Sequence, residues 1–195
     1  MRKYLLTLVL ILSFVPCRAQ RNTGYYEDYV QYIPLVMDLG LDLVGVKSVD
    51  GYPDILIATA TSILSETIMV NSLKLLIKEE RPNGTAFNSF PSGHTATAFN
   101  AAELVRIEYG WGWGIAAYSA ATVVGCSRVA HQCHWWWDSV AGALVGIASA
   151  QIGYRTVHPI KRLFGWEMPK EAQLSLRPSV DPFTGAVGTR LSLAF

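Results

Sequence analysis

Lys74-Leu-Leu-Ile-Lys-Glu-Glu-Arg81-Pro82 is the first of three short polar clusters that decide how this chain is organised. The second is Pro91-Ser92-Gly93-His94, and the third is Ser127-Arg128 followed by His134 and Asp138. Mostly apolar sequence surrounds each cluster, and a Lys, Arg, His or Asp is costly to bury unless another group pairs with it. Three such exceptions within one third of the chain indicate that the clusters form one site.

Length and composition describe one unusually apolar domain. At 195 residues the chain has the size of a single domain and is long enough to bury a sizeable core. Apolar residues make up 51% of it and charged residues only 16%, against roughly 25% charged residues in soluble domains. This balance favours a membrane-associated or unusually well-buried helical protein and argues against a second catalytic domain.

The N-terminal segment Met1–Gln20 has the pattern of a secretory signal peptide, with a basic start, a short apolar run and a small residue near its end. A retained N-terminal anchor and a lipidation site at Cys17 are the alternatives. Removal of the segment takes away three basic residues and no acid, which changes the formal net charge from +1 to −2. We therefore expect an exported protein in the periplasm or the cell-envelope membrane, without a basic footprint for nucleic acid. There Cys126 and Cys133 would form a disulfide or remain two buried free thiols.

Apolar periodicity predicts an all-α bundle of about five to six helices. The helical stretches are Ile33–Val46, Asp54–Glu80, Thr95–Glu108, the segment between Glu108 and Arg128, and Ser139–Tyr154. Pro82 should end the second helix, because the residue before a proline is pushed out of the α region. The 19 uncharged residues between Glu108 and Arg128 are expected to be the only stretch of the mature chain long enough to cross a bilayer, although tight packing in a soluble core explains them nearly as well.

The C-terminal part of the chain changes character. Gln173–Val180 and Val187–Phe195 alternate apolar and polar residues around a turn-like Asp181–Gly185, a pattern typical of a β-hairpin. A lone hairpin cannot close an outer-membrane barrel, so its purpose stays open. The predicted organisation is a signal peptide at 1–20, a helical domain at 21–168 and an extension at 169–195 that forms the appended hairpin.

The first two clusters have features of an anion site. Lys74 and Arg81 are seven residues apart and would lie on nearly the same face of a helix, where two cations need an anion, although both could instead be solvated charges. Ser92 and Gly93 come just before a helix, where backbone N–H groups favour negative charge and a glycine permits close approach. His94 could then donate a proton to a leaving oxygen, while the alternative for this cluster is a helix cap.

The third cluster adds a nucleophile and another cation. His134 and Asp138 are four residues apart, so a carboxylate could fix one imidazole nitrogen and leave the other as a nucleophile. A core histidine and a His/Asp metal pair are alternatives, but only His131 is close enough in sequence to add a metal ligand. Arg128 suits bidentate recognition of phosphate oxygens. Together the clusters match what phosphoryl transfer requires.

These residues and their spacings resemble the three-part signature of the type 2 phosphatidic acid phosphatase and haloperoxidase superfamily. Every signature position is matched over about one third of the chain, and the flanking helices fit an all-helical core. The resemblance implies that the phosphate oxygens are held by Lys74, Arg81, Arg128, Ser92 and the backbone of Gly93. It also implies that His134 forms a phosphohistidine, that Asp138 holds its imidazole, and that His94 protonates the leaving alcohol and later activates water. It implies no metal or other cofactor for hydrolysis.

We therefore expect an exported phosphatase for phosphomonoesters or pyrophosphates, facing the periplasm. Lipid phosphates at a membrane surface are the favoured substrates, such as phosphatidic acid, phosphatidylglycerol phosphate, undecaprenyl pyrophosphate or lipid A phosphates. The alternatives are a soluble periplasmic acid phosphatase of broad specificity, a vanadate-dependent haloperoxidase, and a structural envelope protein docked through its hairpin. Trp135, Trp136 and Trp137 suit a membrane interface, while core packing explains them equally well. The oligomeric state is left open.

Overall fold

The computed structural model describes residues 29–165, 173–180 and 187–194. The predicted signal peptide, Met1–Gln20, and the predicted turn, Asp181–Gly185, lie outside the described residues. The chain divides into two compact units, of which the first ends at Val157 and the second begins at His158.

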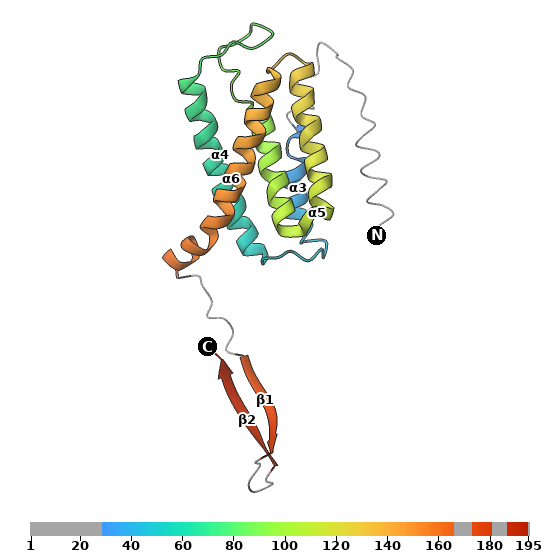
Figure 1. Cartoon of the computed structure of the whole chain (residues 1–195), viewed down its shortest axis with the longest axis vertical. Coiled ribbons are helices and arrows are strands. Elements are labelled where there is room, and N and C mark those ends of the chain that lie inside the picture. Colours follow the sequence, from blue (N-terminus) through green and yellow to red (C-terminus); the bar gives the residue numbers. More distant parts are fainter. Residues whose placement is uncertain (1–28, 166–172, 181–186, 195) are drawn as a thin grey trace. The chain divides into compact units, whose positions relative to one another are not determined.

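Within the described residues the first unit is built from helices, as predicted (Figure 1). These are α3 (Ile33–Gly40), α4 (Tyr52–Leu76), α5 (Gly93–Ala130) and α6 (Trp136–Leu163), the last of which continues into the second unit. α5 is interrupted at Gly110, whose φ of 77° and ψ of −179° are not helical. The chain reverses there, so the two halves of α5 run side by side in opposite directions (Figure 1).

The core between the two halves of α5 consists of small apolar side chains. The residues Ala98, Ala102 and Val105 of the first half pack in one cluster with Ala117, Ala121 and Val124 of the second. Side chains this small allow close helix packing without voids. The small-residue composition of the stretch after Glu108 therefore reflects packing within the protein.

Three helix boundaries differ from the prediction. α4 ends at Leu76, and Ile77 is already extended with φ −112° and ψ 107°, so the helix stops well before Pro82. The prediction that Lys74 and Arg81 share a helix face is therefore wrong, because Arg81 lies in the following loop. α3 ends at Gly40 instead of Val46, and α6 continues through Pro159 to Leu163.

The prediction that the segment after Glu108 is the only possible membrane span is also wrong. Among the described residues, α4 is the one helix long and apolar enough to cross a membrane, with a mean hydropathy of 1.3 in its most apolar window. The Gly, Ser, Tyr and Trp residues after Glu108 lower the mean hydropathy of that segment. A single such helix is weak evidence for a span, since the core helix of a soluble protein has the same composition.

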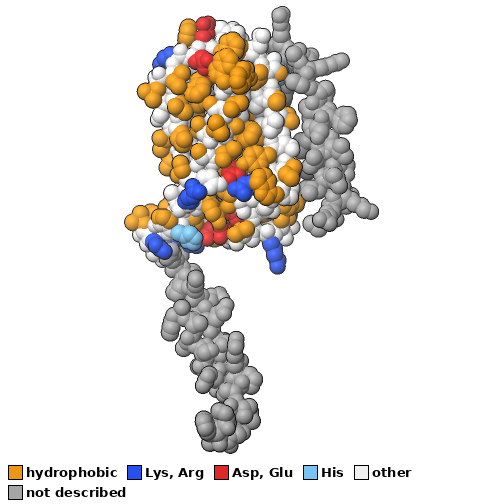
Figure 2. All heavy atoms as spheres, in the orientation of Figure 1, with side chains coloured by type: hydrophobic (Ala, Val, Ile, Leu, Met, Phe, Trp, Pro, Cys, Tyr) orange, Lys and Arg blue, Asp and Glu red, His pale blue; other side chains and the backbone are white. Residues whose placement is uncertain are grey.

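Exposed apolar side chains gather over α4 and α6 (Figure 2). On α4 they are Leu56, Ile63, Leu64, Ile68, Leu75 and Leu76, and on α6 they are Val140, Leu144 and Ile152. Large exposed apolar patches are typical of surfaces that contact lipid or another protein. Part of the high apolar content of the chain therefore consists of exposed side chains.

In the second unit, β1 (Gln173–Val180) and β2 (Val187–Ala194) pair as antiparallel strands. Gln173 lies opposite Ala194, and Val180 lies opposite Val187. Because the connecting residues 181–186 lie outside the described ranges, the complete hairpin stays a prediction.

α6 approaches its neighbours closely at glycines. A Cβ atom added at Gly153 would lie 2.6 Å from the carbonyl oxygen of Ala58 and 2.7 Å from the backbone nitrogen of Ser62, both in α4. Backbone atoms of a packed helix cannot move aside as a flexible side chain can. Gly153 therefore fixes how near α6 comes to α4.

We predict that Gly153→Ala lowers the free energy of unfolding by about 1–3 kcal/mol, because the new methyl group overpacks the α4–α6 contact. The melting temperature of the purified protein should fall by about 3–10 °C. Gly112→Ala is the matched control, since a Cβ at this exposed helical position meets nothing within 4 Å. Equal melting temperatures for the two variants would show that α6 does not depend on this close approach.

Candidate active site

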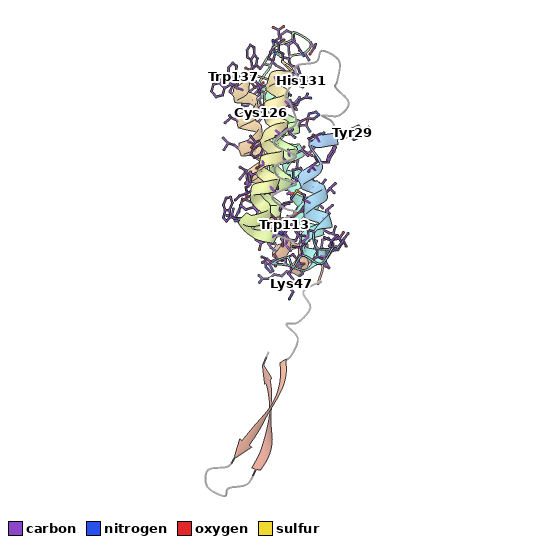
Figure 3. All side chains as sticks on the ribbon, turned by 90° about the vertical axis from the view of Figure 1, so that its right-hand side faces the viewer. Tyr29, Lys47, Trp113, Cys126, His131 and Trp137 are labelled. Carbon is purple, nitrogen blue, oxygen red and sulfur yellow. The ribbon has the colours of Figure 1, made fainter. Side chains whose placement is uncertain are left out.

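The three polar clusters meet at one end of the helical unit. The first occupies the last turn of α4 and the loop behind it, the second begins α5, and the third lies between the end of α5 and the start of α6. His131 and Trp137 mark this end of the unit, while Lys47 and Trp113 mark the opposite end (Figure 3). The clusters are thus neighbours in space although more than 60 residues separate Lys74 from Asp138.

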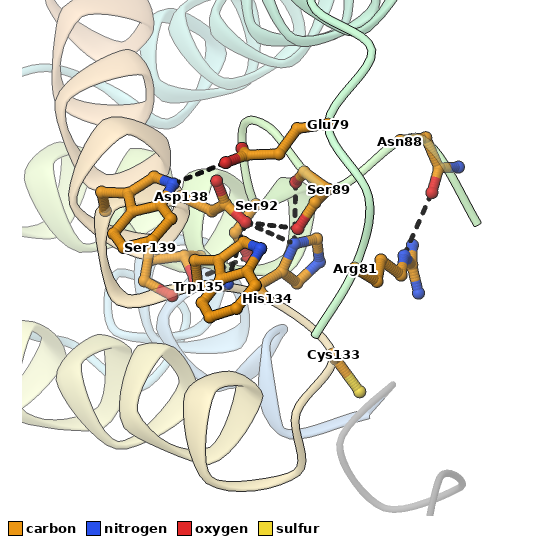
Figure 4. Close-up of polar contacts among 12 residues, drawn as sticks. Glu79, Arg81, Asn88, Ser89, Ser92, Cys133, His134, Trp135, Asp138 and Ser139 are labelled. Atoms are coloured by element: carbon orange, nitrogen blue, oxygen red, sulfur yellow. Dashed lines mark hydrogen bonds and ion pairs between the residues drawn. The ribbon is translucent and has the colours of Figure 1, made fainter. Parts of the chain in front are cut away.

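His134 is buried in the loop just before α6, with 2% of its surface exposed. Its Nδ1 lies 2.8 Å from the main-chain carbonyl oxygen of Ser89 (Figure 4). A carbonyl oxygen only accepts hydrogen bonds, so Nδ1 carries the proton and donates it. Nε2 of the neutral ring therefore keeps its lone pair, as a nucleophile requires.

The sequence led us to expect that the Asp138 carboxylate holds this imidazole directly. In the structure the carboxylate is near the ring, but the Ser89 carbonyl oxygen is nearer. Oδ2 of Asp138 lies 3.6 Å from Nδ1 of His134, within ion-pair range but beyond the Ser89 hydrogen bond. Oδ2 instead accepts hydrogen bonds from the Ser89 hydroxyl and from the backbone N–H of Trp135, the latter at 2.9 Å. The carboxylate thus orients the imidazole mainly through Ser89 (Figure 4).

The backbone of Asp138 also reaches the second cluster. Its carbonyl oxygen accepts a hydrogen bond from the backbone N–H of Ser92 at 3.0 Å. Ser92 is the N-cap residue of α5, but its hydroxyl does not cap the helix and instead pairs with the Thr95 hydroxyl at 2.9 Å. Gly93 and His94 follow, half-buried, in the first turn. The start of α5, with its outward-pointing N–H groups, therefore lies beside the third cluster.

Lys74 and Arg81 are brought together by a residue that the sequence did not single out. Lys74 Nζ donates to the main-chain oxygen of Asn88 at 2.7 Å, and Arg81 Nε donates to the side-chain Oδ1 of Asn88 at 3.0 Å. Asn88 precedes Ser89, so one short loop positions two cations and the imidazole. The residues of this loop show no periodicity and no charge pattern. The sequence alone therefore gave no signal for the roles of Asn88 and Ser89.

Arg128 is buried near the end of α5. Its main-chain carbonyl oxygen accepts hydrogen bonds from the backbone N–H groups of Cys133 at 3.1 Å and His134 at 3.3 Å. These bonds fold the loop back onto the end of α5.

Electrostatics link all three cations to one imidazole. Burial and, to a smaller extent, the charges of Arg81, Arg128 and Lys74 together lower the pKa of His134 to about 4, against the opposing effect of Asp138. Burial and the charge of Arg81 likewise lower the pKa of Lys74 to about 8. At neutral pH the site therefore holds a neutral imidazole surrounded by positive charge, an environment that favours an anion.

The three tryptophans form the rim of the site. Trp135 and Trp137 stack with ring centroids 5.0 Å apart, and Trp137 Nε1 donates to the Glu79 carboxylate at 2.8 Å. Trp136 is 63% exposed, and the other two are each 38% exposed. Core packing is therefore the wrong explanation for these residues.

The described residues contain no group of three or more His, Cys, Asp or Glu side chains that could hold a metal ion. The thiols of Cys126 and Cys133 are both free. The site contains cations, which can bind the oxygens of a phosphate ester, and an imidazole, which can attack its phosphorus atom. The carboxylate lies beside the imidazole.

Comparison with known proteins identifies a family from the sequence and a related fold among solved structures. Residues 55–162 match the PAP2 superfamily. The chain is 39% identical over 133 residues to a lipid A 1-phosphatase of Porphyromonas gingivalis, which covers 66% of this chain and 30% of that protein. It is also 39% identical over 66 residues to the bacitracin transport permease protein BcrC of Bacillus licheniformis, covering 32% of this chain and 30% of that protein.

The fold resembles a crystal structure of LpxE from Aquifex aeolicus, with a TM-score of 0.55 and 21% sequence identity. The similarity covers 77% of this chain and 94% of that one. The chain spans less than a third of the length of each of the two sequence relatives. The family match itself takes in more than half of the chain and contains every residue of the three polar clusters. The protein therefore belongs to the PAP2 superfamily, the type 2 phosphatidic acid phosphatases.

Proposed function

We propose that this protein is a phosphatase that hydrolyses lipid phosphates through a phosphohistidine formed on His134. The observation that carries the proposal is the hydrogen bond from His134 Nδ1 to the Ser89 carbonyl oxygen, which leaves Nε2 unprotonated next to three cations. A nucleophile that is neutral at physiological pH needs no base to activate it.

In the first step, Nε2 of His134 attacks phosphorus while the bond from phosphorus to the ester oxygen breaks. Lys74, Arg81 and Arg128 neutralise the equatorial oxygens, together with the Ser92 hydroxyl and the backbone N–H of Gly93. His94 gives its proton to the departing oxygen, which leaves as an alcohol. The phosphorylated ring carries a positive charge, which the Asp138 carboxylate 3.6 Å from Nδ1 stabilises.

In the second step, water attacks the phosphohistidine. His94, now neutral, removes a proton from the water, and the bond from phosphorus to Nε2 breaks. Inorganic phosphate leaves, and both histidines return to their starting states. No redox change and no metal is needed for this balance.

A lipid substrate is supported by two independent features. One is the similarity to a protein named lipid A 1-phosphatase. The other is the apolar surface of α4 and α6, with tryptophans of the kind that favour membrane interfaces around the site. A phosphate on lipid A, phosphatidic acid, phosphatidylglycerol phosphate or undecaprenyl pyrophosphate would suit such a site. These features favour a lipid phosphatase over a soluble acid phosphatase of broad specificity.

The proposal includes the location and organisation expected from the sequence. Residues 1–20 would direct export, residues 21–168 would form the catalytic domain in the periplasm or at the cell-envelope membrane, and residues 169–195 would form an appended hairpin. A membrane surface is the expected partner.

We predict that His134→Ala lowers phosphate release from phosphatidic acid by at least about 10³-fold, because the proposed nucleophile is lost. Phosphate release by the purified protein in detergent measures the effect, and rapid acid-free quenching should detect a phosphoenzyme only when His134 is present. His158→Ala, which removes an exposed imidazole from α6, is the control. Near-normal turnover by a folded His134→Ala variant would rule out the proposed nucleophile.

We also predict a pH effect at Lys74. Its lowered pKa of about 8 means that the free enzyme loses this positive charge as the pH rises through that value, so phosphate binding weakens there. Lys74→Arg keeps the charge at all accessible pH values. The ratio of kcat/KM for Lys74→Arg to that for the unmodified protein should therefore rise above about pH 8.

Titration of His94 and of the substrate affects both proteins and cancels in this ratio. Lys47→Arg, at the opposite end of the helical unit, is the matched control and should give a flat ratio (Figure 3). A flat ratio for Lys74→Arg as well would show that Lys74 does not titrate in the phosphate site.

A further inference from the structure

An apolar groove lies next to the proposed phosphate site. Its volume is about 460 Å³, and it runs between the two halves of α5 and the first turns of α6. Phe99, Cys126, Val129, Trp136 and Val140 are among the residues that line it. A volume of this size is within the range of ligand-binding pockets, roughly 300–1,000 Å³.

The groove is joined to the phosphate site through Thr95. This residue lines the groove, and its hydroxyl lies 2.9 Å from the hydroxyl of Ser92. On the α6 side, Ser139 also lines the groove and directly follows Asp138. The groove therefore begins within one helical turn of two residues of the proposed active site.

The hydroxyl groups along the groove are already hydrogen-bonded within the protein. Besides the pair formed by Thr95, Ser139 Oγ donates to the Gly125 carbonyl oxygen at 3.3 Å, and Thr122 Oγ1 donates to the Tyr118 carbonyl oxygen at 2.8 Å. A peptide or a polar head group would lose hydrogen bonds to water here and find few in return. A hydrocarbon chain has no such cost, and burial of its surface is favourable.

The dimensions fit one chain. The lining residues Trp136, Val140 and Ala143 follow one side of α6 over two turns, a length of about 10 Å. An extended chain entering beside Thr95 would lie along this side of α6, with Phe99 and Val129 beside it.

We propose that this groove binds an acyl chain of the lipid whose phosphate is held by the three polar clusters. The inference rests on the proposed function and adds to it a determinant of substrate choice. Long-chain lipid phosphates should bind better than small phosphate esters, because burial of each methylene is worth roughly a fourfold gain in affinity.

The first experiment compares kcat/KM for long-chain phosphatidic acid with kcat/KM for p-nitrophenyl phosphate. Val140→Trp fills the groove and should lower the ratio of the first value to the second by about fifteenfold, because the acyl chain loses the contact of about two methylenes. Leu144→Trp is the matched control, since Leu144 is one turn further along α6, is 63% exposed and should leave the ratio unchanged. An unchanged ratio for Val140→Trp, or an equal loss of kcat/KM on both substrates, would show that the groove does not bind an acyl chain. Failure of the unmodified protein to hydrolyse any ester would instead overturn the proposed function.

The second experiment does not depend on catalysis and leaves Val140 in place. The exposed Cys126 lies in the groove, so a Cys17→Ser, Cys133→Ser variant carries one reporter thiol. Hexadecylphosphonate, which cannot be hydrolysed, should slow maleimide labelling of Cys126 by about tenfold or more, while butylphosphonate should not. Equal labelling with both probes contradicts the inference. Slower labelling at higher protein concentration without either probe would assign the groove to a second copy of the chain, which also overturns it.

Discussion

The site depends on one buried carboxylate. Asp138 is fully buried, and its side chain accepts hydrogen bonds from the Ser89 hydroxyl and the Trp135 backbone, while its carbonyl oxygen accepts one from the Ser92 backbone. A buried carboxylate is costly unless hydrogen bonds satisfy it, and Oδ2 accepts two, whereas Oδ1 is buried with no hydrogen-bond partner among the described residues. These contacts hold together the start of α6, the loop before α5 and the start of α5, and the Ser89 carbonyl oxygen in turn accepts a hydrogen bond from Nδ1 of His134.

This arrangement explains how an apolar protein tolerates three cations at one end. Lys74 and Arg81 share Asn88, Arg128 is buried, and the charges of all three act on the imidazole of His134. Repulsion among them would destabilise the fold if no anion were bound. In the proposed reaction, the phosphate supplies that anion, and the same charges that stabilise it keep the nucleophile neutral.

The polar clusters could be recognised in the sequence because charged residues stand out in apolar surroundings. The helical class followed from the apolar periodicity, and the proximity of His134 to Asp138 followed from their spacing of four residues. The role of Ser89 could not be found, because a main-chain carbonyl oxygen leaves no side-chain pattern. The position of Arg81 was predicted wrongly because α4 ends at Leu76, where the loop gains hydrogen bonds of its own, such as that from the Ser89 N–H to the Glu79 carbonyl oxygen. The reversal at Gly110 was marked only by a glycine among other glycines.

The exposed apolar side chains of α4 and α6 begin at the end that carries the charged site, which suits the proposed substrate with its anionic head and hydrocarbon tail. The central claim is that the three clusters form one anion site with Nε2 of His134 aimed at phosphorus. A crystal structure with bound orthovanadate tests it most directly. The expected result is a bond from vanadium to Nε2 of His134, with Lys74, Arg81 and Arg128 on the vanadate oxygens. Vanadate bound elsewhere, or a ring turned so that Nδ1 faces the anion, would contradict it.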